Sequence, residues 1–571
     1  MFKIGTAKTD MTYFEPNIGL FGYGQYDHRA IGVETPLYAR AFVIEDSNTN
    51  VVAMVCCEIQ SCTISLKEAV VEKLQQAFVS NIFSEQNVLI TAQHTHSAPG
   101  GYSHYPFYNF STPGFHQGVL DAYTNAVVKS IQKAYQNRVE GELSYHTGFF
   151  DVEVPVAYNR SLSAYNANKD ITKVRTDEEY LAVDREMEVL KFVSKEGKNI
   201  GCLNFFGVHT TTVGNSNDKI CSDNKGYAAQ FLEEEYRKQY DSFVGAFAQK
   251  PCGDVSSIYT NPKTKIKNNL EGCNNDYEKA QENGKYQFQL AKKISEEKGA
   301  VLSGNVDFHL DYANLTQIKI DSEISGRGEA LRTGPACFGV PFFKGTIDGK
   351  GIEGILAVLA EGITSLANWI QKGSILFRSK EGKERLRIKY QTQTVKNIFL
   401  ESSEKRILGM ERFGFLPKSA DKLVEVLIDH FNSDSLEGYP LTPDIVPMQL
   451  IKLGEILLVG MPGEMTVISG KRLKKFILES TKDLGIQKVI IVPYSNAYCG
   501  YVTTPEEYRY QKYEGGHTMY GEYTLWGYMT EFKKLCKEFH KQREDRIFSS
   551  LRPPKFTKEI LDKRSYQVPT H

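Results

Sequence analysis

Short apolar runs that alternate with longer amphipathic segments are the feature that most constrains the fold of this chain. The short runs are rich in apolar and β-branched side chains, which is typical of buried strands, at 50–59, 87–92, 199–206, 242–248 and 488–493. The longer segments have apolar side chains at helical spacing, at 65–79, 117–136 and 223–240. This alternation predicts an α/β (α+β) protein, but it does not distinguish a sandwich from a doubly wound sheet.

Length, charge and cysteine content narrow the class of protein. A chain of 571 residues forms one large elaborated domain or two or three smaller ones. Its formal net charge of -1 offers no general attraction to nucleic acid, so we expect no nucleic-acid partner. The ten cysteines include no C-x-x-C pair, which favours reduced, buried thiols over disulfides or a zinc ribbon.

The sequence contains no obvious targeting or membrane-spanning segment. The first ten residues have no apolar stretch of the kind a secretory signal needs, which favours the cytoplasm over secretion. The most apolar segment, 351–370, is interrupted by Glu353 and Glu361 and is too broken to span a bilayer. We therefore expect a soluble protein that contacts membranes at most peripherally. The basic stretch 378–389 predicts a solvated surface, and the sequence does not indicate an oligomeric state.

Several predicted strands end in loops that carry reactive side chains beside glycine or proline. Loops at strand ends are where rigid scaffolds hold functional groups. These loops contain His94-Thr95-His96, His209, Gly253-Asp254-Val255-Ser256, Pro462-Gly463-Glu464 and Tyr501. The loop that carries Glu464 follows a β-hairpin predicted over 449–459 and centred on Gly454.

Each of these groups also has an ordinary structural interpretation. On a strand, His94 and His96 would share one face with Cα atoms roughly 6.6 Å apart, so both bind a metal, one does, or neither does. His209 alone is more often a hydrogen-bonded structural histidine. Glu464, at the start of a predicted helix, is equally explained by the helix dipole.

The sequence lacks the motifs of several enzyme classes. Ser256 lacks the Gly-x-Ser-x-Gly elbow of α/β-hydrolases, and the chain has no His-Glu-x-x-His, Walker A or Gly-x-Gly-x-x-Gly motif. Tyr501 and Tyr513 belong to a tyrosine-rich stretch that would ordinarily be packing. A metal-dependent phosphatase or sulfatase would need more carboxylates than these loops supply.

Taken in order, these motifs resemble the neutral (non-lysosomal) ceramidase family. The resemblance covers nearly the whole chain. It is carried by Gly5-Thr6-Ala7-Lys8-Thr9-Asp10, His94-Thr95-His96-Ser97-Ala98-Pro99-Gly100-Gly101, Tyr158-Asn159-Arg160-Ser161, Gly253-Asp254-Val255-Ser256, Gly345-Thr346-Ile347-Asp348-Gly349, Pro462-Gly463-Glu464, Tyr501-Val502-Thr503-Thr504-Pro505 and Tyr513-Glu514-Gly515-Gly516.

The resemblance implies a fold and a domain organisation. The fold is a mixed β-sandwich core surrounded by helices, of the neutral ceramidase catalytic-domain type. We expect a catalytic domain over 1–551 and an irregular C-terminal tail over 552–571, without the C-terminal immunoglobulin-like domain that many relatives carry. The sequence departs from the family pattern at Thr210 and Ser257, where the family has proline. These departures leave the substrate more open than the reaction type.

The resemblance also implies roles for individual residues. One Zn²⁺ per chain would be bound by His94, His209, Glu464 and Tyr501. His96, Arg160 and Tyr513 would face the scissile amide. Ser256 would act as a nucleophile or receive the substrate hydroxyl.

The activity that follows is zinc-dependent hydrolysis of the N-acyl amide bond of ceramide to a long-chain base and a fatty acid. Zinc suits this reaction because it activates water and polarises the poorly electrophilic amide carbonyl. One alternative is a zinc amidase that acts on another N-acyl lipid, and an alternative of another class is a catalytically silent lipid-binding protein. Acyl-chain preference and the physiological direction of the reaction are not indicated.

Overall fold

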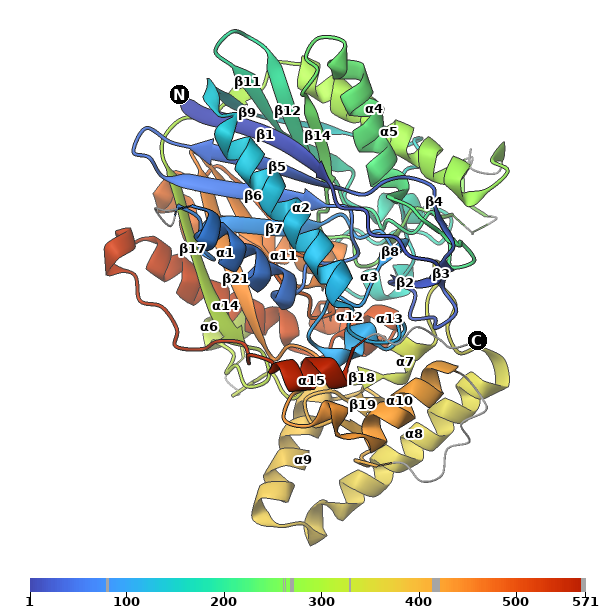
Figure 1. Cartoon of the computed structure of the whole chain (residues 1–571). Coiled ribbons are helices and arrows are strands. Elements are labelled where there is room, and N and C mark those ends of the chain that lie inside the picture. Colours follow the sequence, from blue (N-terminus) through green and yellow to red (C-terminus); the bar gives the residue numbers. More distant parts are fainter. Residues whose placement is uncertain are drawn as a thin grey trace.

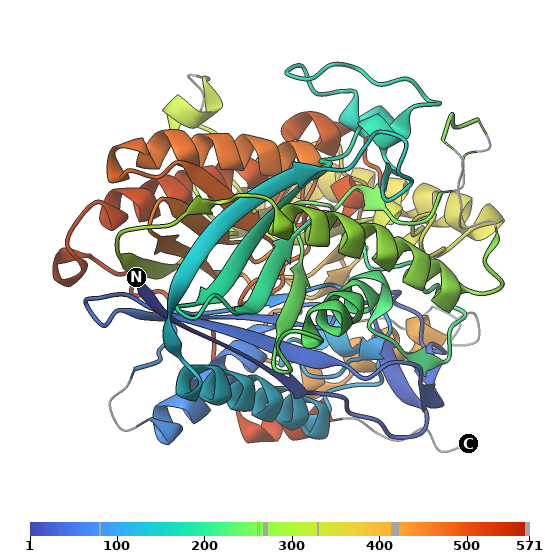
Figure 2. The same cartoon turned by 90° about the horizontal axis from the view of Figure 1, so that it is seen from above.

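Two β-sheets lie face to face at the centre of the computed structural model, and helices cover their outer faces (Figure 1). The structure describes residues 1–78, 82–259, 261, 263–266, 272–327, 330–412 and 422–565. Viewed from above, helices α11 (Val467–Thr481) and α14 (Thr524–Phe539) lie on one side of the sheets, and α1 (Ile64–Ala77) and α2 (Gln117–Gln136) lie on the opposite side (Figure 2).

The larger sheet has nine strands and is mixed. Parallel pairing is confined to β12 with β14 and β6 with β7, while the other strand pairs of this sheet are antiparallel. Its order is β14 (Val244–Ala248), β12 (Asn199–Phe205), β11 (Glu186–Ser194), β9 (Val139–Phe149), β1 (Phe2–Asp10), β5 (Tyr38–Glu45), β6 (Val51–Cys57) and β7 (Val88–Ala92), with β16 (Ala300–Val301) paired to β9.

The smaller sheet has four strands, in the order β17 (Val306–Asn314), β21 (Ile445–Leu453), β22 (Ile456–Gly460) and β24 (Lys488–Val492). Strand β22 shows why the two sheets stack. Ile456 and Leu458 pack into the core shared with the larger sheet, whereas Leu457 and Val459 pack into the core beneath α11 and α14. Side chains alternate across a strand, so one apolar strand supplies two cores.

Helices complete the layers on the outer side of the larger sheet. Val70 and Leu74 of α1 pack with Val127 of α2 against the sheet, and α4 (Asp223–Arg237) with α5 (Asp276–Glu296) covers the other end. The layers therefore run helix, sheet, sheet, helix. This confirms the predicted α/β class with a mixed β-sandwich core surrounded by helices.

Individual predicted elements lie close to their expected bounds. Segment 117–136 forms α2, and 449–459 falls within the β21–β22 hairpin, whose turn contains Gly454 with φ +60°. The hairpin is longer than predicted because β21 begins at Ile445, where it pairs with β17. All ten cysteine thiols are free and nine of them are buried, in agreement with the expected reduced thiols.

Two other segments differ from expectation or extend it. Within the tail expected over 552–571, α15 (Lys558–Lys563) is helical, and the buried Arg564 donates from Nε to the Ser435 carbonyl at 2.6 Å. An irregular tail is therefore wrong for this part, because residues 558–564 are anchored. Residues 566–571 lie outside the described residues, and a domain boundary at 551 stays a prediction. Segment 351–370 contributes to helix α8 (Gly354–Ser374), and the described helices include none able to cross a bilayer.

Candidate functional site

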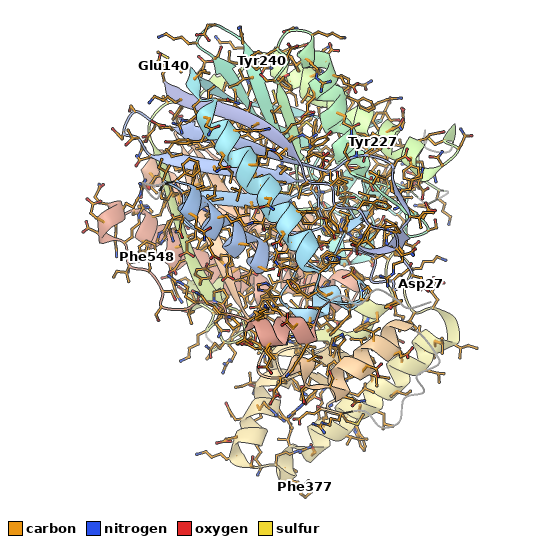
Figure 3. The ribbon with its side chains drawn as sticks, viewed as in Figure 1. Asp27, Glu140, Tyr227, Tyr240, Phe377 and Phe548 are labelled. Atoms are coloured by element: carbon orange, nitrogen blue, oxygen red, sulfur yellow. The ribbon has the colours of Figure 1, made fainter. Side chains whose placement is uncertain are left out.

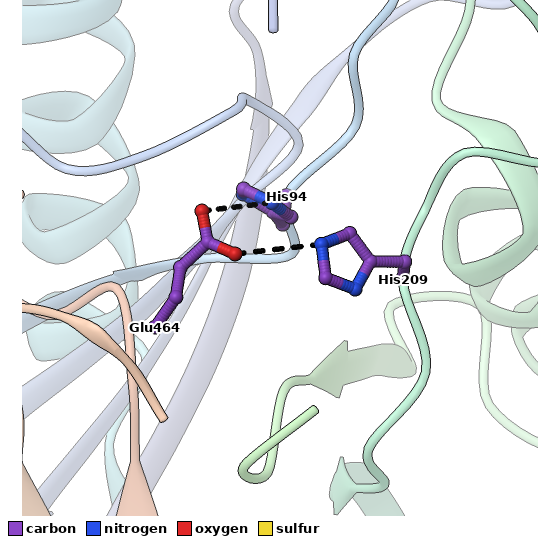
Figure 4. Close-up of side chains that lie close together, drawn as sticks. All are labelled: His94, His209 and Glu464. Atoms are coloured by element: carbon purple, nitrogen blue, oxygen red, sulfur yellow. Dashed lines mark ion pairs between the residues drawn. The ribbon is translucent and has the colours of Figure 1, made fainter. Parts of the chain in front are cut away.

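Three side chains from distant parts of the chain meet beyond the ends of strands from both sheets. His94 follows β7, His209 follows β12 and Glu464 follows β22, and each side chain is buried. Glu464 Oε1 lies 3.4 Å from His94 Nε2, and Glu464 Oε2 lies 3.4 Å from His209 Nε2 (Figure 4). One ligand atom from each residue lies within 4.8 Å of the others, so the three can hold one metal ion.

Backbone carbonyls orient the two imidazoles. Nδ1 of His94 donates to the Gln60 carbonyl at 2.7 Å, and Nδ1 of His209 donates to the Cys252 carbonyl at 2.9 Å. Because Nδ1 of each ring is held by a carbonyl, Nε2 is the nitrogen that faces Glu464 in both histidines. Second hydrogen bonds of this kind are typical of histidine metal ligands.

The backbone at His94 corrects the expected strand geometry. Strand β7 ends at Ala92, and His94 has φ +80°, which is the left-handed region. His94 and His96 therefore do not alternate along a strand as predicted, although their Nε2 atoms lie 3.2 Å apart. In this conformation the His94 ring stacks on the Tyr494 ring, with ring centroids 4.2 Å apart. Left-handed backbone at a non-glycine residue costs energy and concentrates at functional sites.

Glu464 is not at a helix start. It belongs to β23 (Glu464–Met465), which pairs in parallel with β25 (Tyr501–Val502), and helix α11 begins only at Val467, after its cap Thr466. The helix-dipole interpretation of Glu464 is therefore wrong. Its carboxylate instead accepts hydrogen bonds from the hydroxyls of Tyr498 and, at 3.3 Å, Tyr494.

The pairing of β23 with β25 brings Tyr501 to the edge of the three side chains. Its hydroxyl lies 3.2 Å from His209 Nε2 and accepts a hydrogen bond from Arg160 Nη2 at 3.0 Å. Burial, together with the charge of Glu464, raises the pKa of Tyr501 well above its usual value. Tyr501 is therefore a neutral phenol in the folded chain.

The three central groups have different proton affinities. Burial lowers the pKa of His94 to about 4, which keeps that imidazole neutral. Burial raises the pKa of Glu464, but the opposing influence of His94 and His209 is larger, so its pKa lies well below the usual value. Burial and Arg160 lower the pKa of His209, yet hydrogen bonds involving Cys252 and Glu464 outweigh them and raise it to about 10. The ionised Glu464 is thus paired with a protonated His209, and a cation that binds here displaces that proton.

His96 is half-buried next to this cluster. Its ring lies 4.8 Å from that of Tyr23, and its Nδ1 is buried without a hydrogen-bond partner among the described residues. Gly22, with φ +143°, makes room for it, since a Cβ there would come within 2.3 Å of the His96 ring. Burial and the neighbouring His94 hold the pKa of His96 well below its usual value. His96 is therefore neutral in the folded chain.

Arg160 links the remaining predicted residues. Its guanidinium donates to Asp348 Oδ2 at 2.5 Å and to Glu514 Oε1 at 3.0 Å, and it lies 5.6 Å from the centre of the Tyr513 ring. Ser256 donates its hydroxyl proton to the other oxygen of Asp348. The structure therefore brings together all eight residues predicted from the sequence: His94, His96, Arg160, Ser256, His209, Glu464, Tyr501 and Tyr513.

The sequence analysis missed residues that hold this arrangement in place. Asp348 bridges Arg160 and Ser256, and Glu514 holds Arg160 from the other side. Tyr498 supports Glu464. Asp348 and Glu514 stand inside motifs that carried the family resemblance, so those motifs contained the signal, but nothing in the sequence indicated which partners they would meet.

The donor set fits a divalent transition-metal ion. Two imidazole nitrogens and one carboxylate oxygen, with a phenol at the edge, are donors of the nitrogen and oxygen type. Two histidines and one glutamate are the protein ligands of several catalytic zinc sites.

Comparison with known proteins agrees with this geometry. Residues 2–407 and 419–530 match the family described as neutral/alkaline non-lysosomal ceramidase, N-terminal. The neutral ceramidase of Pseudomonas aeruginosa is 30% identical over 538 residues, covering 94% of this chain and 72% of the relative. Neutral ceramidase B of Dictyostelium discoideum is 31% identical over 565 residues, with the same coverage of 94% and 72%.

Solved structures give the same result. A structure described as ceramidase complexed with C2 superposes with a TM-score of 0.78 at 27% identity, covering 97% of this chain and 77% of that chain. A crystal structure of neutral ceramidase from Pseudomonas aeruginosa superposes with a TM-score of 0.76 at 27% identity, covering 97% and 76%. The chain therefore belongs to the neutral/alkaline non-lysosomal ceramidase family of hydrolases.

Proposed function

We propose that this protein hydrolyses the N-acyl amide bond of ceramide, with one zinc ion per chain, to a long-chain base and a fatty acid. The observation that carries the proposal is the meeting of His94, His209 and Glu464 around one point beside Tyr501. Membership of the family supports the substrate, because its named relatives are ceramidases.

Zinc is the metal that this donor set favours. His94 and His209 would supply neutral Nε2 atoms, Glu464 a carboxylate oxygen and Tyr501 its hydroxyl. A zinc ion bound there supplies Lewis-acid polarisation of a carbonyl and makes water a better nucleophile at neutral pH. The single charged ligand leaves the site with net positive charge, which suits both tasks.

Other residues have roles that follow from their contacts. The Tyr513 hydroxyl has no hydrogen bond to the described part of the chain, so it is available to the carbonyl oxygen of a substrate. The guanidinium of Arg160 is engaged by Asp348, Glu514 and the Tyr501 hydroxyl, so we assign it to holding Tyr501 in place. The neutral His96, with its Nε2 3.2 Å from that of His94, is placed to exchange a proton with a group bound beside His94.

The surroundings of Ser256 favour substrate positioning over nucleophilic attack. Its hydroxyl is buried, donates to Asp348 and is also bonded to the backbone of Ile258. A serine nucleophile is activated by an adjacent base such as histidine, and neither of these partners is an imidazole. Ser256 and Asp348 together can instead receive a hydroxyl of the substrate.

The decisive experiment combines metal analysis with turnover. We expect about one zinc per chain and release of fatty acid from a fluorescent short-chain ceramide that stops when a chelator is added. The His94→Ala variant should lose both zinc and turnover, whereas His540→Ala, at the end of α14, should retain both. Full activity in His94→Ala would remove the assignment.

The remaining outcomes choose between the alternatives. Zinc without ceramide turnover would keep the amidase chemistry and direct the search to other N-acyl lipids through a substrate panel. A chain that neither binds zinc nor turns over ceramide, even after zinc is added back, would fit a catalytically silent lipid-binding protein.

A further inference from the structure

Helix α8 has its apolar side chains turned outward. Ile355 is 79% exposed and Trp369 is 72% exposed, and in the adjoining short helix η4 (Ile375–Phe377) Phe377 is 88% exposed. Phe377 lies at the far end of the region that projects from the sandwich (Figure 3). We call this surface the α8 outer face, and it consists of Ile355, Leu356, Val358, Leu359, Ile363, Leu366, Trp369, Ile370, Leu376 and Phe377.

The side of α8 that faces the protein carries small and polar side chains. Thr364 and Asn368 are buried, and Asn368 Nδ2 donates to the Ile398 carbonyl of β19 (Ile398–Glu401) at 3.0 Å. Glu361 pairs with Lys344 at 2.6 Å. An ordinary surface helix buries its apolar face and exposes its polar face, and α8 does the reverse. Its polar contacts fix this orientation, since turning the helix over would leave them unpaired.

The exposed apolar side chains are concentrated here. Ten of the 25 large exposed apolar residues in the described part of the chain belong to the α8 outer face. Scattered exposed apolar residues are normal, but a contiguous apolar patch on a folded protein marks an interaction site. The chain therefore presents this face to something less polar than water.

The α8 outer face borders the candidate site. Helix α7 (Val340–Phe343) contacts α8, and the half-buried Phe342 ring lies 5.4 Å from the Tyr513 ring. Asp348, which binds Arg160 and Ser256, stands on the segment that joins α7 to α8. An apolar molecule that leaves a surface covering α8 would thus meet aromatic side chains before it reaches Tyr513.

Basic side chains follow this apolar face along the chain, whereas Glu353 is exposed at the start of α8. Helix α9 (Lys380–Gln393) follows η4, and Lys372, Arg378, Lys380 and Arg387 are exposed. Glu381 and Glu384 are the exposed acidic residues of α9. Exposed apolar side chains beside lysine and arginine are typical of helices that lie in a membrane interface and attract anionic headgroups.

We propose that the α8 outer face docks the protein onto a phospholipid bilayer that contains anionic lipids. The helix lies in the plane of the interface, with its apolar side chains among the upper acyl chains and the basic side chains at the headgroups. This goes beyond the proposed hydrolysis, and it can be tested without any turnover.

Tryptophan fluorescence offers a direct probe, because the chain has only two tryptophans, Trp369 and Trp526. In a Trp526→Phe variant, the signal comes from the α8 outer face alone. With vesicles of phosphatidylcholine and phosphatidylglycerol at seven to three, we expect a blue-shifted emission and quenching by lipids brominated in their acyl chains. Unchanged emission at saturating lipid would overturn the proposal.

Vesicle sedimentation separates this face from exposed apolar residues elsewhere. The Ile363→Ser/Ile370→Ser variant should bind these vesicles about 100-fold more weakly, because two side chains no longer enter the apolar phase. The matched control, Phe149→Ser/Ile547→Ser, replaces exposed apolar residues that do not belong to the α8 outer face and should bind as the unaltered chain does. Equal losses in the two double variants would contradict the assignment, as would binding that does not weaken as salt is raised.

Two further measurements control for misfolding of the variants. Zinc content and circular dichroism should match the unaltered chain in all variants, and the Trp369 measurement leaves α8 intact, so a folding defect cannot imitate the result.

Sedimentation velocity tests whether a second copy of the chain, and not a bilayer, covers the α8 outer face. If the chain pairs through α8 and does not bind vesicles, the face joins two copies and the proposal is wrong. Vesicle binding without ceramide hydrolysis would support docking and count only against the proposed function.

Discussion

At the scale of single residues, the site depends on side chains held from two sides. The ring of His94 is fixed by the Gln60 carbonyl on one edge and by stacking on Tyr494 across its face. Its left-handed backbone is what allows both contacts. A sequence pattern reports the period of a strand and contains no information about the single residue where the strand stops. The expectation for His94 and His96 therefore named the right residues with the wrong geometry.

Asp348 offers a test of positioning without loss of metal. Asp348→Asn keeps the shape of the side chain but removes the charge shared by Arg160 and Ser256. We expect turnover to fall about 10- to 100-fold while zinc content is unchanged, because losing a partner that orients the side chains of a metal site typically costs about that much activity. Metal analysis and the fluorescent ceramide assay measure the two effects separately. In the same segment, Glu353→Gln alters an exposed carboxylate and should change turnover by less than about twofold.

Lys225 should give stability a characteristic dependence on pH. It is fully buried in α4, its Nζ donates to the Phe206 carbonyl at 2.7 Å, and burial lowers its pKa from 10.5 to about 7. Between these values the unfolded chain binds more protons than the folded chain, so the free energy of unfolding rises with pH, by at most about 1.4 kcal/mol per unit.

The Lys225→Met variant lacks this contribution. Urea unfolding at pH 7, 8 and 9 should therefore show the unaltered chain gaining stability relative to Lys225→Met as pH rises. Lys238→Met, which alters an exposed lysine, should run parallel to the unaltered chain. A constant difference between the unaltered chain and Lys225→Met would contradict the lowered pKa.

At the scale of elements, periodicity and turn residues predicted several of the strands and helices that lead into the candidate site. Helix α2 and the β21–β22 hairpin lie where their patterns placed them, since 3.6- and 2-residue periods and a turn glycine are local signals. Glu464 was wrongly predicted at a helix start because only local signals can be read from the sequence. The short β23–β25 pairing that holds it joins residues far apart in the chain, and no local pattern reports such a pairing.

The outward orientation of the apolar side of α8 could not be predicted from the sequence either. Segment 351–370 is the most apolar stretch of the sequence, and only the contacts of Thr364 and Asn368 show which side of its helix faces the protein. The eight candidate site residues could be named because they stand in family motifs. Their supporting partners could not, because hydrogen bonds across the fold follow from its packing.

The hairpin turn provides a prediction about the smaller sheet. Gly454 has φ +60°, and a Cβ there would come within 2.1 Å of the Ser303 carbonyl oxygen. Gly454→Ala should lower the free energy of unfolding by about 2 kcal/mol or more, from the backbone strain and the clash together. The control Gly485→Ala has φ +72° with nothing within 4 Å, and strain alone should cost it about 1 kcal/mol. Equal losses in urea unfolding would show that the clash is relieved.

At the scale of the whole molecule, the candidate metal site joins the two sheets. His94 and His209 follow strands of the larger sheet, whereas Glu464 follows a strand of the smaller one. An ion bound by all three therefore bridges the sandwich. A ligand that binds only the folded state stabilises it by mass action, so the ion should make a measurable contribution to stability.

Removal of the metal should accordingly lower the melting temperature. We expect a zinc chelator to reduce the Tm by about 5 °C or more, and added zinc to restore it. The His94→Ala variant should melt at the same temperature with and without chelator. Differential scanning calorimetry distinguishes these outcomes, and an equal shift in His94→Ala would mean that the stabilising ion binds elsewhere.

The dispersal of the site along the chain also sets the time at which it can form during synthesis. His209 and Tyr501 are 292 residues apart, a stretch that a ribosome translates in about 15 s or more. For most of that interval the two histidines have been made without Glu464 or Tyr501, and an ion held by two imidazoles is easily lost. Capture of the proposed ion would therefore be one of the last events in the making of this protein, because it requires that both sheets have already come together.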